Sequence, residues 1–529
     1  MFGWFRKKRP THPLADPDET RALIATLAGN PPAKALAQIG EWLDSITEAR
    51  EFELQERWRV VDLLDQASLA PRRRLMQESL SPARSNKVAE ERRSAGALAF
   101  WKSLGAAYLR CLLTLRGAEP GAALLAKDTT ALLVTRALRA ASVQLKWTYM
   151  RHSQAEARLW QELGGTYQFA ETQGVAGLRT QLYAEDPAAC TAQEELLKAV
   201  MLAMAMPHNL EALPLHLAER FIAHFSSRFV LATKPAEGCV SAFDLEAGRP
   251  PARAREDMTA STLRFFGVGD SVPGIDGLVE QIHAKDGIPG DLNLGGTFDI
   301  DAVLAALAHL TRIWGAAAPP ARGAERDAAA IRVTVVPGLP NILRCLEFMA
   351  AGVPLDPKNF LEQETWEVLD RSKTGYGVWV PDERESFEFD PLSGNRIANG
   401  DWLRIGSLIA LREKGEKDWR VGVVRRILYD ELKRCRAGIG MIEGAAAVVR
   451  LASATGPRAN EPERRRSAVL MAHASEGDAE AIVLMRAGHF MSSQRMAMQF
   501  EGHDYVLEPD ALIEGGEDFD CVRFKLSER

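Results

Sequence analysis

Three residues in the C-terminal half of the chain have the types and spacing of a small polar site. Asp370, Ser372 and Gly375 form a D-x-S-x-x-G pattern at the end of the run WEVLDRSKTGYG. In a β-strand alternate side chains share a face, so Asp370 and Ser372 are predicted to point to the same side. A carboxylate accepts hydrogen bonds, a hydroxyl donates or accepts, and a glycine allows a left-handed turn and a close backbone approach. The pattern predicts a ligand site or simply a tight turn, because Asp and Ser also cap turn N–H groups.

The same segment resembles the PilZ family, whose signature is D/N-x-S-x-x-G at the end of a barrel strand. All three fixed positions match, and the runs LRIGSLIALR, WRVGVVRRI and AGIGMIEG follow in that family's strand order. The resemblance covers about residues 362–452. It implies a small antiparallel β-barrel with cyclic di-GMP as its ligand. Asp370 and Ser372 would then read guanine, since a carboxylate accepts from the guanine N1–H and amine.

The PilZ family also uses an R-x-x-x-R pair just before its first barrel strand, because the guanidinium fork matches phosphate oxygens and the guanine O6/N7 edge. The preceding residues here, PLDPKNFLEQET, contain no such pair. A literal match, Arg249 to Arg253, lies far upstream, and Arg371 is the arginine nearest the motif. Other arginines that the sequence does not place are Arg425, Arg426 and the run 464–466. The predicted ligand-binding set is Asp370, Arg371, Ser372, Gly375, Arg249 and Arg253.

No other pattern indicates catalysis or metal binding. The six cysteines are scattered singly, and there is no H-E-x-x-H motif. His216 and His224 lie eight residues apart on one predicted helix, where positions in the core or on the surface are the simpler interpretation. The glycine-rich run 266–274 lacks the spacing of a phosphate loop and is predicted to be a turn. We therefore predict a protein that is not an enzyme and has no metal or cofactor. An active site within 236–350 is the alternative, which a deep polar pocket there would favour.

Composition and charge narrow the classes of partner. The 529 residues are 46% hydrophobic, which is enough to fill several cores. Lys and Arg number 65 against 71 Asp and Glu, so the net charge of −6 argues against binding a nucleic-acid duplex. The most apolar stretch, 96–115, carries Lys102 and Arg110 and is predicted to be a core helix, so no transmembrane segment is expected. The N-terminal MFGWFRKKRP lacks the apolar region of a secretory signal, and a cytoplasmic location is predicted.

The first part of the chain has the pattern of a helical array. Apolar residues recur at three- and four-residue spacings through residues 1–235, and β-branched residues are sparse. Two segments, 101–108 and 160–167, both read W-x2-L-G-x2-Y, which resembles the first helix of a tetratricopeptide repeat. They are 59 residues apart rather than about 34, so we predict divergent helical hairpins; an ordinary helical bundle is the alternative. A solenoid of this kind typically presents a surface to a protein partner.

The sequence thus predicts an α+β multidomain protein, an N-terminal helical, repeat-like domain followed by a PilZ-like antiparallel β-barrel and a further β-rich extension. The predicted segments are 1–235 (helical), 236–350 (mixed, mainly helical), 355–455 (barrel) and 460–529 (β-rich). The predicted function is a cyclic di-GMP-responsive signalling adaptor whose helical domain binds a protein partner. The alternative is a degenerate PilZ-like scaffold that acts only through protein–protein contacts.

Overall fold

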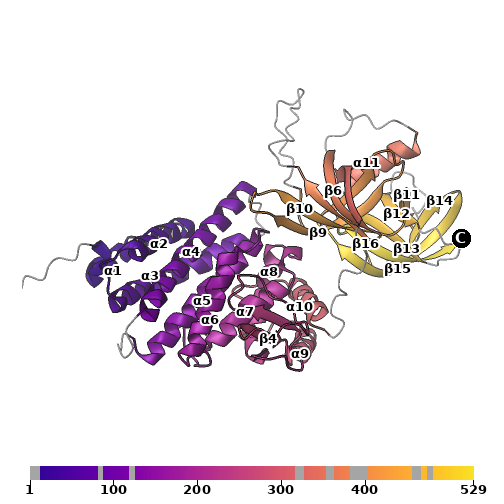
Figure 1. The fold of residues 1–529 in the computed structure, drawn as a ribbon. Helices are drawn as coiled ribbons and strands as arrows, with labels where there is room; N and C mark the ends of the chain where they lie inside the picture. Colours follow the sequence, from indigo (N-terminus) through magenta and orange to yellow (C-terminus); the bar gives the residue numbers. More distant parts are fainter. Residues whose placement is uncertain are drawn as a thin grey trace, which may run out of the picture. The chain divides into compact units, whose positions relative to one another are not determined.

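The chain forms two compact units, Met1–Pro320 and Ala321–Arg529, in the computed structural model (Figure 1). The structure describes residues 12–81, 87–117, 125–186, 188–315, 327–352, 363–381, 402–454, 466–472 and 480–528.

Helices dominate the first part of the first unit, as the apolar spacing predicts. The central helix is α5, in which nearly every side chain from Thr130 to Tyr149 is buried. It contacts α4, α6, α7 and α8, so these four helices surround it. Their bounds are α1 (Pro17–Ala25), α2 (Pro32–Glu48), α3 (Leu54–Leu80), α4 (Lys87–Arg116), α5 (Lys127–Met150), α6 (Ala157–Thr172), α7 (Ala192–Met204) and α8 (Ala212–His224).

The two W-x2-L-G-x2-Y segments lie on α4 and α6, and their aromatic and leucine side chains are buried. A Cβ atom at Gly105 would collide with the Gln144 side chain of α5, so this glycine lets two helices approach closely. A Cβ atom at Gly164 would collide with the backbone of Leu245, which belongs to a loop. The same sequence pattern therefore packs against a helix in one copy and against a loop in the other.

A small sheet and two more helices complete the first unit. Strands β1 (Val230–Ala232), β2 (Ser241–Asp244), β3 (Ala252–Arg253) and β4 (Leu263–Gly267) pair in the order β1-β4-β2-β3. Helices α9 (Ser271–Lys285) and α10 (Ile300–Trp314) follow. Phe243, Phe266 and Leu307 belong to the same apolar cluster as the helices α2–α8, so this region shares their core. The turn predicted in the run 266–274 is present, with Gly269 at φ +54° between β4 and α9.

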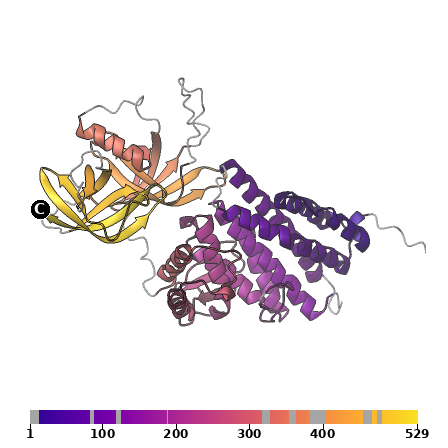
Figure 2. The same cartoon turned by 180° about the vertical axis from the view of Figure 1, so that it is seen from behind.

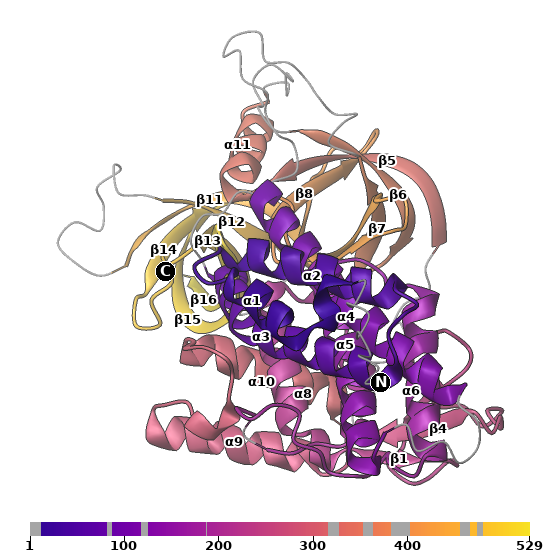
Figure 3. The ribbon, with the colours of Figure 1, turned by 90° about the vertical axis from the view of Figure 1, so that its left-hand side faces the viewer.

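The second unit begins with a closed β-barrel, in which the strands follow the order β10-β7-β6-β5-β8-β9. Figure 3 shows β5, β6, β7 and β8 of this barrel. Its interior is apolar and includes Val333, Trp366, Val378 and Ile439. Strand β5 lies in the predicted mixed segment 236–350, and its pairing with β6 and β8 closes the barrel. The bounds are β5 (Asp327–Pro337), β6 (Glu364–Ser372), β7 (Gly375–Val380), β8 (Leu408–Glu413), β9 (Arg420–Tyr429) and β10 (Cys435–Met441).

A second closed barrel follows, with the strand order β11-β12-β13-β16-β15-β14. The predicted fold class, helices followed by an antiparallel barrel and a further β-rich part, is confirmed, and the β-rich part itself closes into a barrel. Its bounds are β11 (Ala445–Ser453), β12 (Arg466–Ala472), β13 (Glu480–Arg486), β14 (Met496–Phe500), β15 (His503–Gly515) and β16 (Phe519–Glu528).

The two barrels share a core around helix α11 (Leu339–Ala350), which follows β5 (Figure 2). One apolar cluster joins Ile342 of α11, Val423 on the outer face of the first barrel and Phe519 of the second. The Leu339 N–H at the start of α11 donates to the Asp518 carboxylate at 2.6 Å, which satisfies an otherwise unpaired helix donor. The two barrels are therefore packed against each other, and a carboxylate of the second barrel caps the N-terminus of α11.

No helix in the described ranges combines the length and apolarity that a membrane crossing requires. Within those same ranges, no three His, Cys, Asp or Glu side chains gather in a way that would hold a metal ion.

Candidate ligand-binding face of the first barrel

The D-x-S-x-x-G residues lie at the β6–β7 hairpin. Ser372 pairs with Gly375 across a two-residue turn, and the Ser372 hydroxyl donates to the Gly375 carbonyl at 3.3 Å. A Cβ atom at Gly375 would collide with the Ile439 carbonyl of β10, so the predicted close backbone approach is present. The left-handed conformation that we expected at Gly375 is absent, because its φ is not positive. The glycine is needed here for space and not for backbone conformation.

Asp370 and Ser372 share the outer face of the barrel, as the strand period predicts. Their neighbours across the hairpin are Gly377 and Gly375, whereas the interior residue Tyr376 pairs with Arg371. Cross-strand partners point to the same side of a sheet. A Cβ atom at Gly377 would lie 2.7 to 2.9 Å from the Asp370 carboxylate atoms, so the carboxylate rests directly on this glycine.

A surface without side chains extends from this carboxylate across two strands. Gly375 and Gly377 of β7 pair with Gly440 and Gly438 of β10. We call these four residues the glycine strip. Gly375 and Gly377 are buried, whereas Gly438 and Gly440 are half-buried, so the strip exposes its backbone mainly on β10. A residue without a side chain lets a planar ring approach the backbone there.

Two arginines border the glycine strip on the far side from Asp370. Arg426 of β9 pairs with Gly438, and a β-bulge shifts the register directly after this pair. Val424 and Ile427 point into the barrel, so the bulge leaves both Arg425 and Arg426 on the outer face, where they are exposed. A Cβ atom at Gly440 would lie 3.0 Å from the Arg425 side chain. The face thus carries a carboxylate at one edge, glycines in the middle and two guanidinium groups at the other edge.

Arg425 also contacts the second barrel. Its two terminal nitrogens donate to the Glu514 carboxylate of β15 at 2.5 and 2.8 Å. Such a bidentate pair is the strongest geometry that an arginine and a carboxylate can form. The guanidinium of Arg425 is therefore held at the boundary between the barrels, beside the strip.

A tryptophan lies next to the glycine strip on the same face. Trp379 follows Gly377 by two residues in β7 and pairs with Arg436 of β10. The guanidinium carbons of Arg436 and Arg434 lie 4.2 and 4.6 Å from the centre of a Trp379 ring, within cation–π distance. Asp430 accepts a 2.8 Å hydrogen bond from Arg434 and fixes its position. Sequence reasoning missed this group, although the alternation G-x-G-x-W at 375–379 and R-x-G-x-G at 436–440 contains it.

The other predicted site residues are three arginines, of which only Arg371 belongs to the barrel. Arg371 points to the interior side at the end of the barrel, where its Nη1 lies 3.3 Å from the Glu413 carboxylate. Tyr376 donates to the same carboxylate at 2.9 Å, and burial raises the pKa of Tyr376 to about 12. Arg249 and Arg253 belong to the first unit, with Arg253 in β3 opposite Ser241. The structure therefore groups Asp370, Ser372 and Gly375 on the outer face of the barrel, and Arg371 points to the other side of the sheet. The run 464–466 falls outside the described residues except for Arg466, the first residue of β12.

The buried histidine His216 in the helical part has hydrogen-bond partners on both ring nitrogens. His216 is buried, accepts at Nδ1 from Lys146 at 2.8 Å, and donates from Nε2 to the Leu294 carbonyl at 2.9 Å. Lys146 also donates to Glu219 at 2.6 Å. Burial, together with the Lys146 charge, lowers the pKa of His216 to about 3. His216 is thus a neutral connector between helices and a loop, in agreement with the interpretation of it as a core residue.

Comparison with known families concerns the helical part. Residues 18–236 match the family described as "Cyclic-di-GMP receptor FimW, N-terminal domain". The match runs from α1 through α8 and β1 and covers less than half of the chain. The helical domain is therefore similar to the N-terminal domain of a cyclic di-GMP receptor. No curated protein and no solved structure matches the chain.

Proposed function

We propose that the protein is a cyclic di-GMP receptor that acts as a non-enzymatic signalling adaptor. The ligand binds on the outer face of the first barrel, and the helical domain binds a protein partner. The observation that carries this proposal is the in-register row Asp370, Gly377, Gly438 and Arg426, which crosses four strands. The similarity of the helical part to a receptor of this class supports the choice of ligand.

The chemistry of the row matches the parts of a guanine dinucleotide. Asp370 accepts hydrogen bonds from the guanine N1–H and exocyclic amine, which adenine does not offer in that arrangement. The planar base contacts the backbone at Gly438 and Gly440, the two half-buried residues of the glycine strip. Ser372 keeps its hydroxyl oxygen as an acceptor, because its hydrogen is already donated to Gly375. Arg425 and Arg426 take the phosphate-binding role that the PilZ resemblance gives to an R-x-x-x-R pair.

Isothermal titration of the full chain tests the proposal. We expect cyclic di-GMP to bind with a Kd of about 10 µM or tighter, and cyclic di-AMP to bind at least about tenfold more weakly. The double variant Asp370→Ala with Ser372→Ala should lose binding and keep its melting temperature. Asp504→Asn, which removes an exposed carboxylate of β15, is the matched control and should bind normally.

Two results would decide against the receptor. The first is the absence of heat with cyclic di-GMP at about 100 µM, which corresponds to a binding free energy weaker than about −5.5 kcal/mol. The second is equal affinity of the double variant and the wild type. Either result would favour the alternative, a barrel without a ligand that acts as a scaffold for protein–protein contacts.

A further inference from the structure

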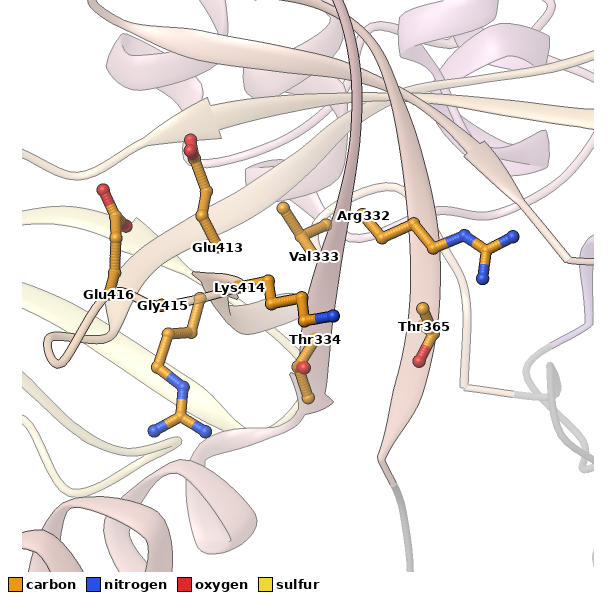
Figure 4. Close-up of a pocket in the computed structure, with 9 residues that line it drawn as sticks. Arg332, Val333, Thr334, Thr365, Glu413, Lys414, Gly415 and Glu416 are labelled. Carbon is orange, nitrogen blue, oxygen red and sulfur yellow. The ribbon is translucent and has the colours of Figure 1, made fainter.

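A pocket of about 420 Å³ opens on a different side of the first barrel, at β5, β6 and β8 (Figure 4). Its lining residues are Arg332, Val333, Thr334, Thr365, Arg412, Glu413, Lys414, Gly415 and Glu416. The glycine strip lies on β7 and β10, and none of the pocket residues comes from these two strands. The volume is within the range of pockets that bind small molecules, about 300–1,000 Å³.

Three cationic side chains line this pocket on strands that are neighbours in the sheet. Arg332 comes from β5, Arg412 from β8, and Lys414 from the turn after β8. Within the described ranges, the structure records no ion pair for any of the three, although Glu367 of β6 pairs in register with Arg332. In the described ranges, the positive charges of these three side chains are therefore not neutralised by an ion pair with a carboxylate.

The two acidic residues at the pocket are already engaged by other groups. Glu413 lies 3.3 Å from Arg371 and accepts from Tyr376 at 2.9 Å on the interior side of the barrel. Glu416 lies 3.2 Å from Arg420. Figure 4 shows the Glu413 side chain pointing away from Lys414, whose side chain runs toward Thr334. Both carboxylates therefore interact with arginines at the rim of the barrel, and neither forms an ion pair with the three cations of the pocket.

The remaining polar groups are arranged for an anion. Thr334 pairs in register with Thr365 on one side and with Arg412 on the other, so two hydroxyls and a guanidinium share one face. The Arg412 guanidinium lies 4.7 Å from the centre of a Trp419 ring, which restricts its orientation. Arginine forks and hydroxyl donors together are the usual protein ligands of phosphate oxygens.

We propose that this pocket binds the phosphate chain of a small polyphosphate-bearing molecule, such as a nucleoside di- or triphosphate. Three cations on two adjacent strands and a turn match an anion that spreads several charges along a chain better than they match a single phosphate. The site lies apart from the glycine strip, so it adds a second ligand to the protein and does not depend on the first.

Titration of the full chain with inorganic tripolyphosphate, GTP, ATP and citrate tests this site. We expect tripolyphosphate to bind, and the double variant Arg332→Gln with Lys414→Gln to weaken it at least about tenfold. Both side chains are exposed, so the variant should fold. Arg450→Gln, which removes an exposed cation of the second barrel, is the control and should bind normally.

Comparing the affinities for these compounds shows which part of a ligand the pocket contacts. Equal affinity for tripolyphosphate and the nucleotides means that the pocket reads the phosphate chain alone, and tighter nucleotide binding means that it also contacts the nucleoside. Three results overturn the proposal: no binding of any polyphosphate at about 1 mM, equal binding by the double variant, or citrate binding as tightly as tripolyphosphate. Because the double variant leaves the glycine strip intact, its affinity for cyclic di-GMP reports separately on the proposed receptor function.

Discussion

Asp370 owes its position to the missing side chain at Gly377. Its carboxylate occupies the space that a Cβ atom at residue 377 would fill. Neither Gly377 nor Gly438 has a positive φ, so the backbone conformation at these positions does not require glycine. Glycine is therefore required at these positions because another group occupies the space of a side chain. This group is the Asp370 carboxylate at Gly377 and, in the proposed function, the ligand at Gly438. Gly438 has the more open position, since its nearest neighbour is the Arg426 side chain at 3.4 Å.

The adjacent glycines of α6 provide a matched test of close packing. A Cβ atom at Gly164 would collide with the Leu245 backbone, whereas one at Gly165 would meet nothing within 4 Å. We expect Gly164→Ala to lower the free energy of unfolding by about 1–3 kcal/mol, because the loop must move. Gly165→Ala should be neutral or stabilising by up to about 1 kcal/mol through helix propensity. Urea denaturation followed by circular dichroism compares the two, and equal effects would contradict the packing described at Gly164.

At the scale of elements, the bulge in β9 decides which arginines reach the ligand face. Without it, Arg425 and Arg426 would point to opposite sides of the sheet. With it, both lie on the outer face, and Arg425 reaches Glu514 of the second barrel. Phosphate and the Glu514 carboxylate would therefore compete for the same guanidinium.

This competition predicts the effect of removing Glu514. Glu514→Gln should tighten cyclic di-GMP binding by about 3–10-fold, because Arg425 can then bind phosphate without first breaking an ion pair with a carboxylate. Glu508→Gln is the control, since it breaks the exposed Arg495–Glu508 pair of the second barrel and should leave the affinity unchanged. Weaker or unchanged binding by Glu514→Gln would show that Arg425 does not bind the ligand.

The contacts of His216 connect α5, α8 and the loop at Leu294, and they predict a pH dependence of stability. The folded pKa is about 3, against an ordinary value of 6.5, so between these two values the unfolded chain binds more protons than the folded chain. The free energy of unfolding should therefore fall as the pH drops from about 6.5 toward 3, by at most about 1.4 kcal/mol per pH unit from this group. His224 and His309, whose pKa values burial also lowers, should add to the same trend.

Urea denaturation at pH 7 and pH 5 measures this dependence. The variant His216→Gln should lose less stability than the wild type between the two pH values. An identical loss in both proteins, or a wild type that is more stable at pH 5, would contradict the assignment of His216 as a neutral buried side chain.

The sequence predicted correctly the features that depend only on the residue period within one strand or helix. The alternation in β6 placed Asp370 and Ser372 on one face, and the apolar spacing predicted the helices. It did not predict the side-chain directions and the barrel closure that depend on pairing between strands far apart in the sequence. The interior direction of Arg371 and the outward direction of Arg425 depend on bulges in β6 and β9, and each bulge depends on register with a partner strand. Closure of the second barrel likewise needs β11 to pair with β14, more than 40 residues later.

At the scale of the second unit, the two barrels behave as one body because α11 is packed between them. Ile342 is fully buried in the cluster that α11 shares with both barrels. Loss of this side chain therefore removes apolar contacts with both barrels at once.

This arrangement predicts that Ile342→Ala destabilises the two barrels together. The expected cost is about 2–5 kcal/mol. Hydrogen exchange should show faster exchange in both β7 and β13, while Leu432→Ala, which truncates a side chain that is 72% exposed, should leave both unchanged. Faster exchange confined to one barrel would contradict the shared core.

For the whole molecule, the central claim is that the glycine strip of the first barrel receives cyclic di-GMP. The most direct test compares the wild type with Gly438→Leu in a titration of the full chain with cyclic di-GMP. A Cβ atom at Gly438 would have no backbone atom of another residue among its near contacts, and its nearest neighbour is the Arg426 side chain at 3.4 Å. The rest of the leucine side chain would cover the strip. We predict a Kd of about 10 µM or tighter for the wild type and no binding at about 100 µM for the variant, with equal melting temperatures. Equal affinity of the two proteins would contradict the account.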